Sequence, residues 1–146
     1  MKLSTKGRYG TRAALELALR YGSGPVMVRE IADCQDISER YLEHILNALR
    51  ASGIVRSTRG ARGGYELAKA PDSVTVGDVV RSLEGPLDIV SCTHDGACAR
   101  SQACVTMEIW RDVKGAVESV LDGVTLDELV RRHRARAGAS GVDYAI

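Results

Sequence analysis

A glycine-rich segment between two short apolar runs places the strongest constraint on the fold. Residues 59–64, Arg-Gly-Ala-Arg-Gly-Gly, separate the apolar pair Ile54-Val55 from the alternating run at 65–68. Two such runs joined by a glycine-containing turn predict a β-hairpin. The other ordered segments carry helical patterns. The sequence therefore predicts a mainly α-helical fold with one small β wing.

Three helical segments precede the hairpin, at about 6–21, 28–34 and 38–51. Apolar side chains recur at the 3-4 spacing of one helix face in each of them, and Tyr21 falls on that face in the first. Ser38 is a good N-cap for the third helix. Helix, short helix, turn, capped helix and basic hairpin in this order predict a winged helix-turn-helix domain over residues 1–84.

Composition agrees with a small helical domain. Aromatic residues make up 4% of the 146 residues and Phe is absent, so the core must consist of Leu, Val, Ile and Ala, which favours helices over a sandwich or barrel. No apolar run approaches the length of a membrane span, and the N-terminus has no signal peptide pattern. We therefore expect a cytoplasmic protein with reduced thiols and no membrane association.

The small net charge of +1 conceals an uneven distribution. Residues 1–70 contain 12 Lys and Arg against 7 Asp and Glu, whereas residues 71–146 contain 8 against 12. The first half thus carries +5 and the second −4. A basic half followed by an acidic half favours a polyanion-binding module joined to a second functional part.

Candidate DNA contacts lie at the two places where a winged helix meets the duplex. The N-terminal residues of the third helix face base edges in the major groove, and the arginines of the wing can enter a narrow minor groove. An acid near phosphates costs binding energy unless it meets a cytosine amino group, so Glu43 is a candidate for rejecting wrong sites. The predicted DNA-binding residues are Lys2, Lys6, Arg8, Ser38, Glu39, Arg40, Tyr41, Glu43, Arg59 and Arg62.

The second half divides into a loop and two helices. Thr75 begins a capping box and a helix over about 76–84, and residues 85–104 follow as a cysteine-containing loop. A long helix at about 105–122 carries an apolar stripe that includes Ile109, Trp110 and Val113, which favours pairing with a second chain. Its region, 105–136, also includes a last helix that begins after Thr125, and a flexible tail is expected over 137–146.

Three cysteines with even spacing lie in the loop. Cys92, Cys98 and Cys104 form a C-x5-C-x5-C pattern, which is not the paired spacing of a zinc ribbon or a thioredoxin-like site. With Gly96 allowing a bend, three thiolates can converge on one centre, and soft thiolates select iron–sulfur clusters, zinc or copper(I). Cys34 falls between apolar positions and is expected to be a buried small hydrophobe.

The chain resembles the IscR-like iron–sulfur cluster regulators, a winged helix-turn-helix family. The resemblance extends from residue 1 to about 134, and seven segments carry it: MKLSTKGRYG, SERYLEHIL, VRSTRGARGGYELAK, VGDVVRSLEGP, the three loop cysteines, CVTMEIWRDV and VTLDELV. It implies a homodimeric transcription regulator with a 2Fe-2S or 4Fe-4S cluster on those cysteines. It also implies that Glu43 discriminates between operator types, while Ser38, Arg40, Tyr41 and Arg59 contact DNA.

The fourth cluster ligand is the main departure from that family. IscR proteins have a histidine three positions after the last cysteine, and here that position is Met107. Some relatives recruit an acidic or histidine ligand from the partner's first helix, where this chain has Arg8 and Arg12, which cannot bind iron. Met107, His94 and Glu108 remain candidates, as do a residue of the partner chain and an exogenous thiol or water.

The sequence therefore favours a dimeric regulator that binds operator DNA and senses a cluster, controlling genes of iron–sulfur assembly or of a redox, nitric oxide or iron response. A zinc- or thiol-based sensor of the same fold, for example in cysteine metabolism, is the alternative. A cysteine-dependent redox enzyme is disfavoured, because the chain has no C-x-x-C pair and no evident Ser-His-Asp group. A module that regulates a metabolic enzyme through its acidic half is a third class.

Overall fold

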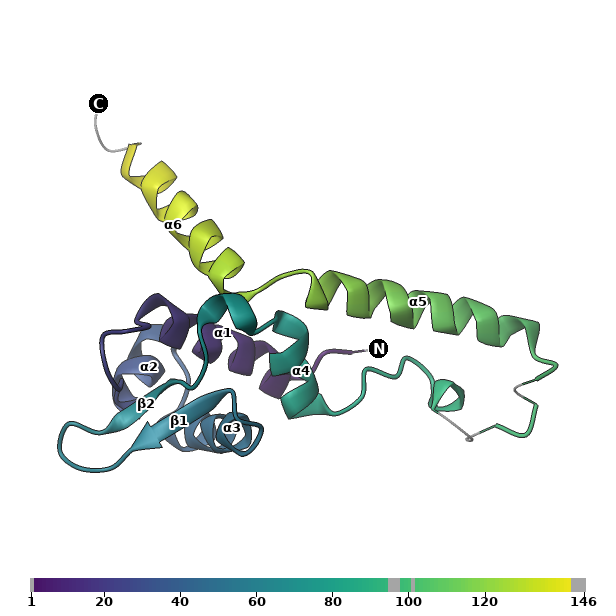
Figure 1. The fold of residues 1–146 in the computed structure, drawn as a ribbon, viewed down its shortest axis with the longest axis horizontal. Helices are drawn as coiled ribbons and strands as arrows, with labels where there is room; N and C mark the ends of the chain where they lie inside the picture. The colour runs from purple at the N-terminus through teal and green to yellow at the C-terminus, as the bar shows by residue number, and fades with distance from the viewer. Residues whose placement is uncertain (1, 95–97, 101, 143–146) are drawn as a thin grey trace.

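The computed structural model describes residues 2–94, 98–100 and 102–142. Figure 1 shows a helical body with a small β-hairpin on one side and two helices that extend from it. The first part of the chain forms α1 (Thr5–Leu19), α2 (Val28–Gln35), α3 (Glu39–Ala51), β1 (Val55–Thr58), β2 (Gly64–Leu67) and the 3-10 turn η1 (Pro71–Ser73). The second part forms α4 (Val76–Glu84), the 3-10 turn η2 (Ser91–Thr93), α5 (Val105–Asp122) and α6 (Leu126–Val142).

Helix α1 lies at the centre of the body. It begins at Thr5 because the Ser4 hydroxyl accepts a hydrogen bond from the backbone N–H of Gly7. The helix contacts α2, α3, α4, α6 and β2. A Cβ on the buried Gly10 would collide with Leu83 of α4, so glycine is needed for these two helices to approach closely. Tyr21 follows the end of α1 and is 50% exposed, so its predicted place on the core face is wrong.

The helix-turn-helix is formed by α2 and α3. Asp36 adopts a left-handed conformation with φ of 52°, which ends α2 and turns the chain. Ser38 then caps α3 by accepting from the backbone N–H of Tyr41, as the sequence predicts. The side chains that α3 directs into the core are fully buried: Leu42, Ile45, Leu46 and Leu49.

The wing is an antiparallel hairpin. Val55 pairs with Leu67 and Thr58 pairs with Gly64, so the predicted turn forms its tip. An isolated bridge between Val26 and Tyr65 attaches β2 to the segment before α2. A Cβ at Gly64 would strike the carbonyl oxygen of Val26, so this close approach requires glycine.

Two contacts join the second half to this domain. Thr75 and Asp78 form the predicted capping box of α4, and Thr75 also bridges to Thr125 just before α6. Arg81 of α4 binds Asp122 at the end of α5 through two hydrogen bonds, of 3.3 and 2.5 Å. A bidentate pair of this kind fixes direction as well as distance, so it orients α5 relative to α4.

Helix α6 belongs with the winged domain rather than with α5. Leu126 and Val130 are 0% and 4% exposed and lie in the same core cluster as α1 and α3. The turn after Asp122 thus returns the chain to the body, so of the two helices expected over 105–136 the second packs on the winged domain. Helix α6 continues to Val142, past the end expected at about 136, and so includes the first part of the segment expected as a flexible tail, 137–146. Residues 143–146 lie outside the described residues.

Helix α5 extends away from the body, with the cysteine loop beside it (Figure 1). Only Met107 of its residues is buried. The element order and the hairpin confirm the predicted mainly α winged helix-turn-helix fold. Among the described residues, no helix has the length and apolar character needed to cross a membrane.

Candidate DNA-reading surface and cysteine loop

The outer face of α3 presents the side chains that could read base edges. Glu39, Arg40 and Glu43 are exposed there, and Glu43 lies one helical turn after Glu39 and Arg40. His44 and Asn47 continue this face and are also accessible, and sequence reasoning missed them. The spacing of four from Arg40 to His44 and from Glu43 to Asn47 was the signal that could have found them. Asn47 accepts a hydrogen bond from the Tyr65 hydroxyl at 3.3 Å, which joins the helix to the wing.

Tyr41 differs from its neighbours because it is half-buried. Its ring meets that of Tyr9 edge-on with the centroids 6.1 Å apart, and the guanidinium of Arg12 lies 5.3 Å from the centre of the Tyr9 ring. Aromatic pairs in this arrangement stabilise packing beyond the area they bury. The contact places the first turns of α1 beside the N-terminus of α3, so Tyr41 serves the packing of the domain whether or not its hydroxyl meets DNA.

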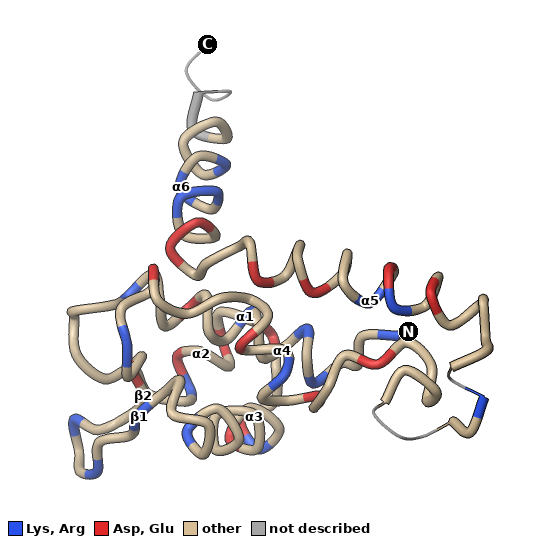
Figure 2. Tube along the Cα trace, turned by 45° about the vertical axis from the view of Figure 1, so that its right-hand side comes forward, with Lys and Arg blue, Asp and Glu red and all other residues tan. Residues whose placement is uncertain are grey.

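The tip of the wing concentrates positive charge, as Figure 2 shows at the turn between β1 and β2. Arg59 and Arg62 are exposed there. Arg56 lower in the wing is paired with Glu66 at 2.8 Å, and Arg50 of α3 donates to the Ser57 hydroxyl at 3.0 Å. The structure therefore divides the local arginines into two that brace the hairpin and two that extend from its tip.

The predicted cations before and within α1 occupy different settings. Lys2 lines a shallow hollow of about 200 Å³ together with Glu84, Leu87 and Asp88, at the start of the cysteine loop. Lys6 is half-buried one turn before Tyr9, and Arg8 is exposed, with its guanidinium 3.5 Å from the Thr5 hydroxyl. Lys2 thus lies at the start of the cysteine loop, whereas Lys6 is one turn before Tyr9, the residue of α1 that contacts Tyr41 of α3.

The three loop cysteines are reduced and half-buried. Within residues 2–94, 98–100 and 102–142, no three His, Cys, Asp or Glu side chains gather closely enough to hold a metal ion. The predicted convergence of Cys92, Cys98 and Cys104 is therefore absent from this conformation. Gly96 lies outside the described residues.

Cys104 has the features of a thiolate ligand. It occupies the N-cap position of α5. A hydrogen bond with the Thr106 hydroxyl, 3.2 Å from Sγ, lowers the pKa of its thiol, and the backbone N–H of Met107 acts in the same direction. Positive charge at a helix N-terminus stabilises an adjacent anion. The site therefore favours the form of sulfur that binds metals and reacts with oxidants.

The three candidates for a fourth ligand are placed unequally. Met107 is 1% exposed and lines a hollow of about 380 Å³ beside Cys104, together with Glu108 and Arg111. Glu108 is exposed. His94 is already engaged, because its Nδ1 lies 2.7 Å from Asp88 Oδ2. Burial next to Cys104 thus favours Met107 by position, although a thioether remains a weak donor.

Asp88 gathers the polar groups of the loop. Its carboxylate accepts a hydrogen bond from Lys114 Nζ of α5 at 2.7 Å and also contacts His94. These two hydrogen bonds, first that from Lys114, lower the pKa of Asp88. Sequence reasoning missed this group, since 26 residues separate Asp88 from Lys114 and no local pattern connects them.

Cys34 is exposed, so its predicted burial is wrong. Ile31 and Ala32 take the core positions of α2, and at about 100° per residue Cys34 points about 60° from Ile31 on the side opposite Ala32, beyond the edge of the buried face. Its sulfur lies 3.5 Å from Nη2 of Arg20. Cys34 is far along the chain from the loop cysteines and serves as an internal comparison for them.

An uncovered apolar face runs along α5. Ile109, Val113 and Val120 are 56%, 41% and 67% exposed, and Trp110 is 37% exposed. A nearly apolar hollow of about 370 Å³ is lined by Val113, Ala116, Val117, Val120 and Leu121. Contiguous exposed apolar side chains mark interaction surfaces in proteins.

Known proteins combine a winged domain of this kind with a loop and a long helix. A model of the Rrf2 family, described as an iron-dependent transcriptional regulator, matches residues 3–132. The chain belongs to the Rrf2 family. It is accordingly a DNA-binding transcription regulator and not an enzyme.

Two kinds of Rrf2 protein are similar to the chain at nearly equal identity. The transcriptional regulator CymR of Bacillus subtilis is 44% identical over 129 residues, which cover 88% of this chain and 89% of CymR. The solved structure of CymR, the global cysteine regulator of that organism, has a TM-score of 0.76 over 90% of this chain and 98% of that one. IscR of Aliivibrio salmonicida is 40% identical over 130 residues, covering 89% and 77%.

Proposed function

We propose that this Rrf2 protein is a homodimeric regulator that binds operator DNA in the cytoplasm and senses the state of an iron–sulfur cluster on Cys92, Cys98 and Cys104. The observation that carries the proposal is the position of the cysteine loop. The loop ends at Cys104, which is also the N-cap of α5, so a change at the sulfur atoms directly affects the long helix. The family description as iron-dependent supports iron as the metal.

The three thiols of the loop are the type of ligand that binds iron–sulfur clusters in proteins. Cys92, Cys98 and Cys104 would hold such a cluster, and the hydrogen bond with Thr106 that lowers the pKa of the Cys104 thiol favours deprotonation of this ligand. When bound, a cluster supplies a centre that responds to oxygen, nitric oxide or iron supply. The chain's own residues hold the sulfur atoms near α5, exclude water at the buried side chain of Met107 and transmit a shift through the helix. A cluster would change operator binding only if it bound more tightly to one conformation of the protein than to the other.

The apolar face of α5 supports the dimer. A helix of 18 residues is about 27 Å long, and the winged body covers one end of it through the Arg81–Asp122 pair. A second copy of α5 offers the same apolar side chains, as a two-fold interface requires. Two winged domains held by this interface would reach two operator half-sites.

Placing carboxylates in that face is expected to separate the dimer. In the double variant Val113→Glu, Val120→Glu, two charges would have to be buried without partners, a cost large enough to shift the protein to monomer at micromolar concentration. Sedimentation velocity measures the outcome. Ser119→Glu, on another side of the same helix, is the matched control and should stay dimeric. A double variant that sediments as the wild-type dimer would exclude this face as the interface.

Arg59→Ala is expected to weaken operator binding about tenfold to a hundredfold, because one well-placed arginine contact is worth about 1–3 kcal/mol. Arg56→Ala is the control, since Arg56 is already paired with Glu66 within the wing. Fluorescence anisotropy at one fixed salt concentration compares the two variants. Equal affinities for wild type and Arg59→Ala would show that the wing tip does not contact DNA.

Glu43→Ala is expected to broaden operator choice while preserving tight binding. Glu43 lies on the exposed face of α3, where a carboxylate is favourable only opposite a donor such as a cytosine amino group. Without Glu43, the ratio of affinities between the best operator and a variant operator should fall by about tenfold. This factor is in the lower part of the discrimination expected from one base contact. A panel of operators changed one base pair at a time provides the measurement. Uniform loss of binding to every operator would contradict this role.

A thiol- or zinc-based sensor linked to cysteine metabolism is the second candidate. The 44% identity to CymR, which is a cysteine regulator, favours it. Anaerobic reconstitution with iron and sulfide separates the two functions. The cluster proposal expects operator affinity to change on reconstitution. Unchanged affinity, combined with a response to thiol oxidation or zinc, would favour the second candidate.

A further inference from the structure

The segment between α4 and Cys92 is fastened at its first end by Glu84. One oxygen of this carboxylate accepts hydrogen bonds from the backbone N–H of Ser4 at 3.2 Å and of Gly7 at 3.0 Å, and it also contacts the Ser4 hydroxyl. These donors lie at the start of α1, where backbone N–H groups lack partners within the helix and a carboxylate is favoured; the Gly7 N–H is shared between Glu84 and the Ser4 hydroxyl. Glu84 thus connects the last residue of α4 to the first turn of the central helix of the DNA-binding domain.

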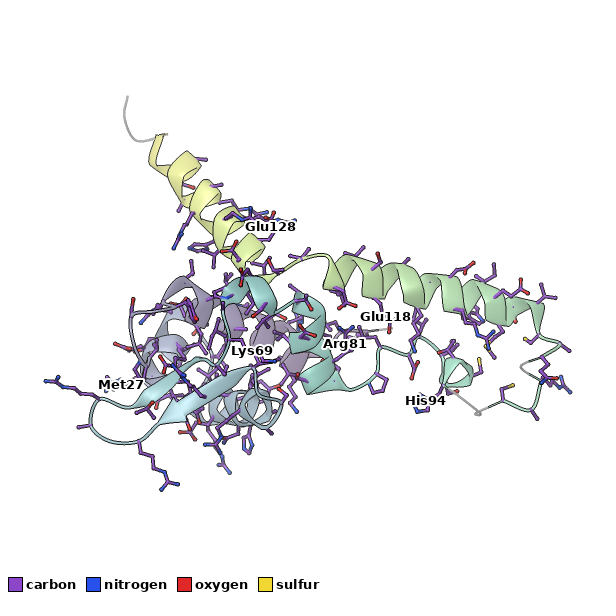
Figure 3. All side chains as sticks on the ribbon, in the orientation of Figure 1. Met27, Lys69, Arg81, His94, Glu118 and Glu128 are labelled. Atoms are coloured by element: carbon purple, nitrogen blue, oxygen red, sulfur yellow. The ribbon has the colours of Figure 1, made fainter. Side chains whose placement is uncertain are left out.

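Asp88 fastens the other end, four residues later. One oxygen accepts from Lys114 Nζ at 2.7 Å and from the Thr93 hydroxyl at 3.3 Å, while the other lies 2.7 Å from His94 Nδ1. Figure 3 shows His94 at η2, on the side of the loop below α5. The Asp88 side chain is 17% exposed and that of Lys114 is 26% exposed, so water competes with this contact less than at an open surface.

We propose that Asp88 is a positioning residue that fastens the turn containing Cys92 to helix α5 and, together with Glu84, couples the cysteine loop to the DNA-binding domain. The inference deepens the proposed function, because it assumes that the loop is where the signal arrives. It assigns the coupling to two carboxylates and one lysine, none of which binds the metal.

Short length and anchoring explain why this segment can transmit a shift. Only residues 85–87 separate the two carboxylates, and Leu87 among them is 6% exposed. The segment therefore has little slack. A ligand that draws Cys92 toward Cys98 and Cys104 must move α5 with the loop or break the contact between Asp88 and Lys114. In both cases the position of α5 relative to the loop depends on whether the ligand is bound. Such a dependence gives the protein two conformational states.

Hydrogen exchange in metal-free, reduced protein tests the positioning itself. The amides of Thr93 and His94 donate to Val90 and Ser91 at 3.1 and 3.3 Å and report on η2. Asp88→Ala and Lys114→Gln are expected to speed exchange across residues 91–94 by at least about fivefold, the factor that corresponds to the net contribution of one typical hydrogen bond. Asp112→Ala on the exposed surface of α5 is the control and should leave exchange unchanged. Equal exchange in wild type and Asp88→Ala would overturn the proposal.

A second measurement tests the coupling. The ratio of operator affinities between cluster-loaded and metal-free protein should fall toward one in Asp88→Ala, while metal-free affinity stays at the wild-type value. Asp88→Asn keeps the size of the side chain and provides the same comparison if the alanine variant does not fold. A full wild-type ratio in these variants would overturn the coupling. If wild type itself carries no cluster, the proposed function fails, whereas the exchange result still decides the role of Asp88.

Discussion

Replacing Cys92, Cys98 or Cys104 with alanine is expected to lower cluster occupancy by about tenfold to a hundredfold or more. Mutation of residues that only hydrogen-bond to metal ligands already lowers metal affinity by this factor. Each variant removes one of the three thiols of the loop, so no spare thiol of the loop can replace it. Among the three, Cys104→Ala should have the largest effect, because its thiol has a lowered pKa and lies at the N-terminus of α5. Iron content per protomer after anaerobic purification measures the loss.

Cys34→Ala is the matched control for these three variants. Cys34 is exposed on α2, and its sulfur contacts Arg20 rather than any residue of the loop. Its replacement should leave iron content unchanged. All four variants should also unfold at the wild-type temperature when metal-free, since none of the four cysteines is in the core. Equal iron loss in the Cys34 variant, or full occupancy in all three loop variants, would disprove the assignment of the loop.

Leu126→Ala is expected to lower the free energy of unfolding by about 2–5 kcal/mol, the usual cost of truncating a fully buried leucine. Leu126 is 0% exposed and joins the start of α6 to the core of the winged domain. A loss of this size is a large fraction of the stability of a small domain. Urea unfolding followed by circular dichroism gives the difference.

Arg134→Ala on the exposed surface of α6 is the control for Leu126→Ala and should change stability by less than about 0.5 kcal/mol. The comparison decides whether α6 is part of the winged domain or an independent extension. A Leu126 variant as stable as the control would show that α6 does not belong to the core.

Local sequence patterns predicted the fold well where the cause of an element is local. Helix α4 matches its predicted range because Thr75 and Asp78 form the capping box that begins it. The hairpin was found because glycine at its tip requires a turn. The prediction for Cys34 failed because the apolar period of an eight-residue helix leaves its inward direction poorly defined.

The features that the sequence could not predict are those made by contacts distant in the chain. The bridge from Thr75 to Thr125 and the burial of Leu126 bring α6 back to the body, and no local pattern encodes them. The contact of Asp88 with Lys114 is of the same kind. For the candidate site, the sequence supplied the residue types and their order. Their relative positions, and the separation of the three thiols in this conformation, required the structure.

The central claim is that the cysteine loop of this Rrf2 regulator carries an iron–sulfur cluster. The most direct test is an anaerobic visible absorption spectrum of the purified protein, with iron and acid-labile sulfide counted on the same sample. The account predicts a brown protein with iron and sulfide in equal amounts, two or four of each per protomer for the two cluster types. A colourless protein without sulfide that binds its operator at full affinity would contradict it.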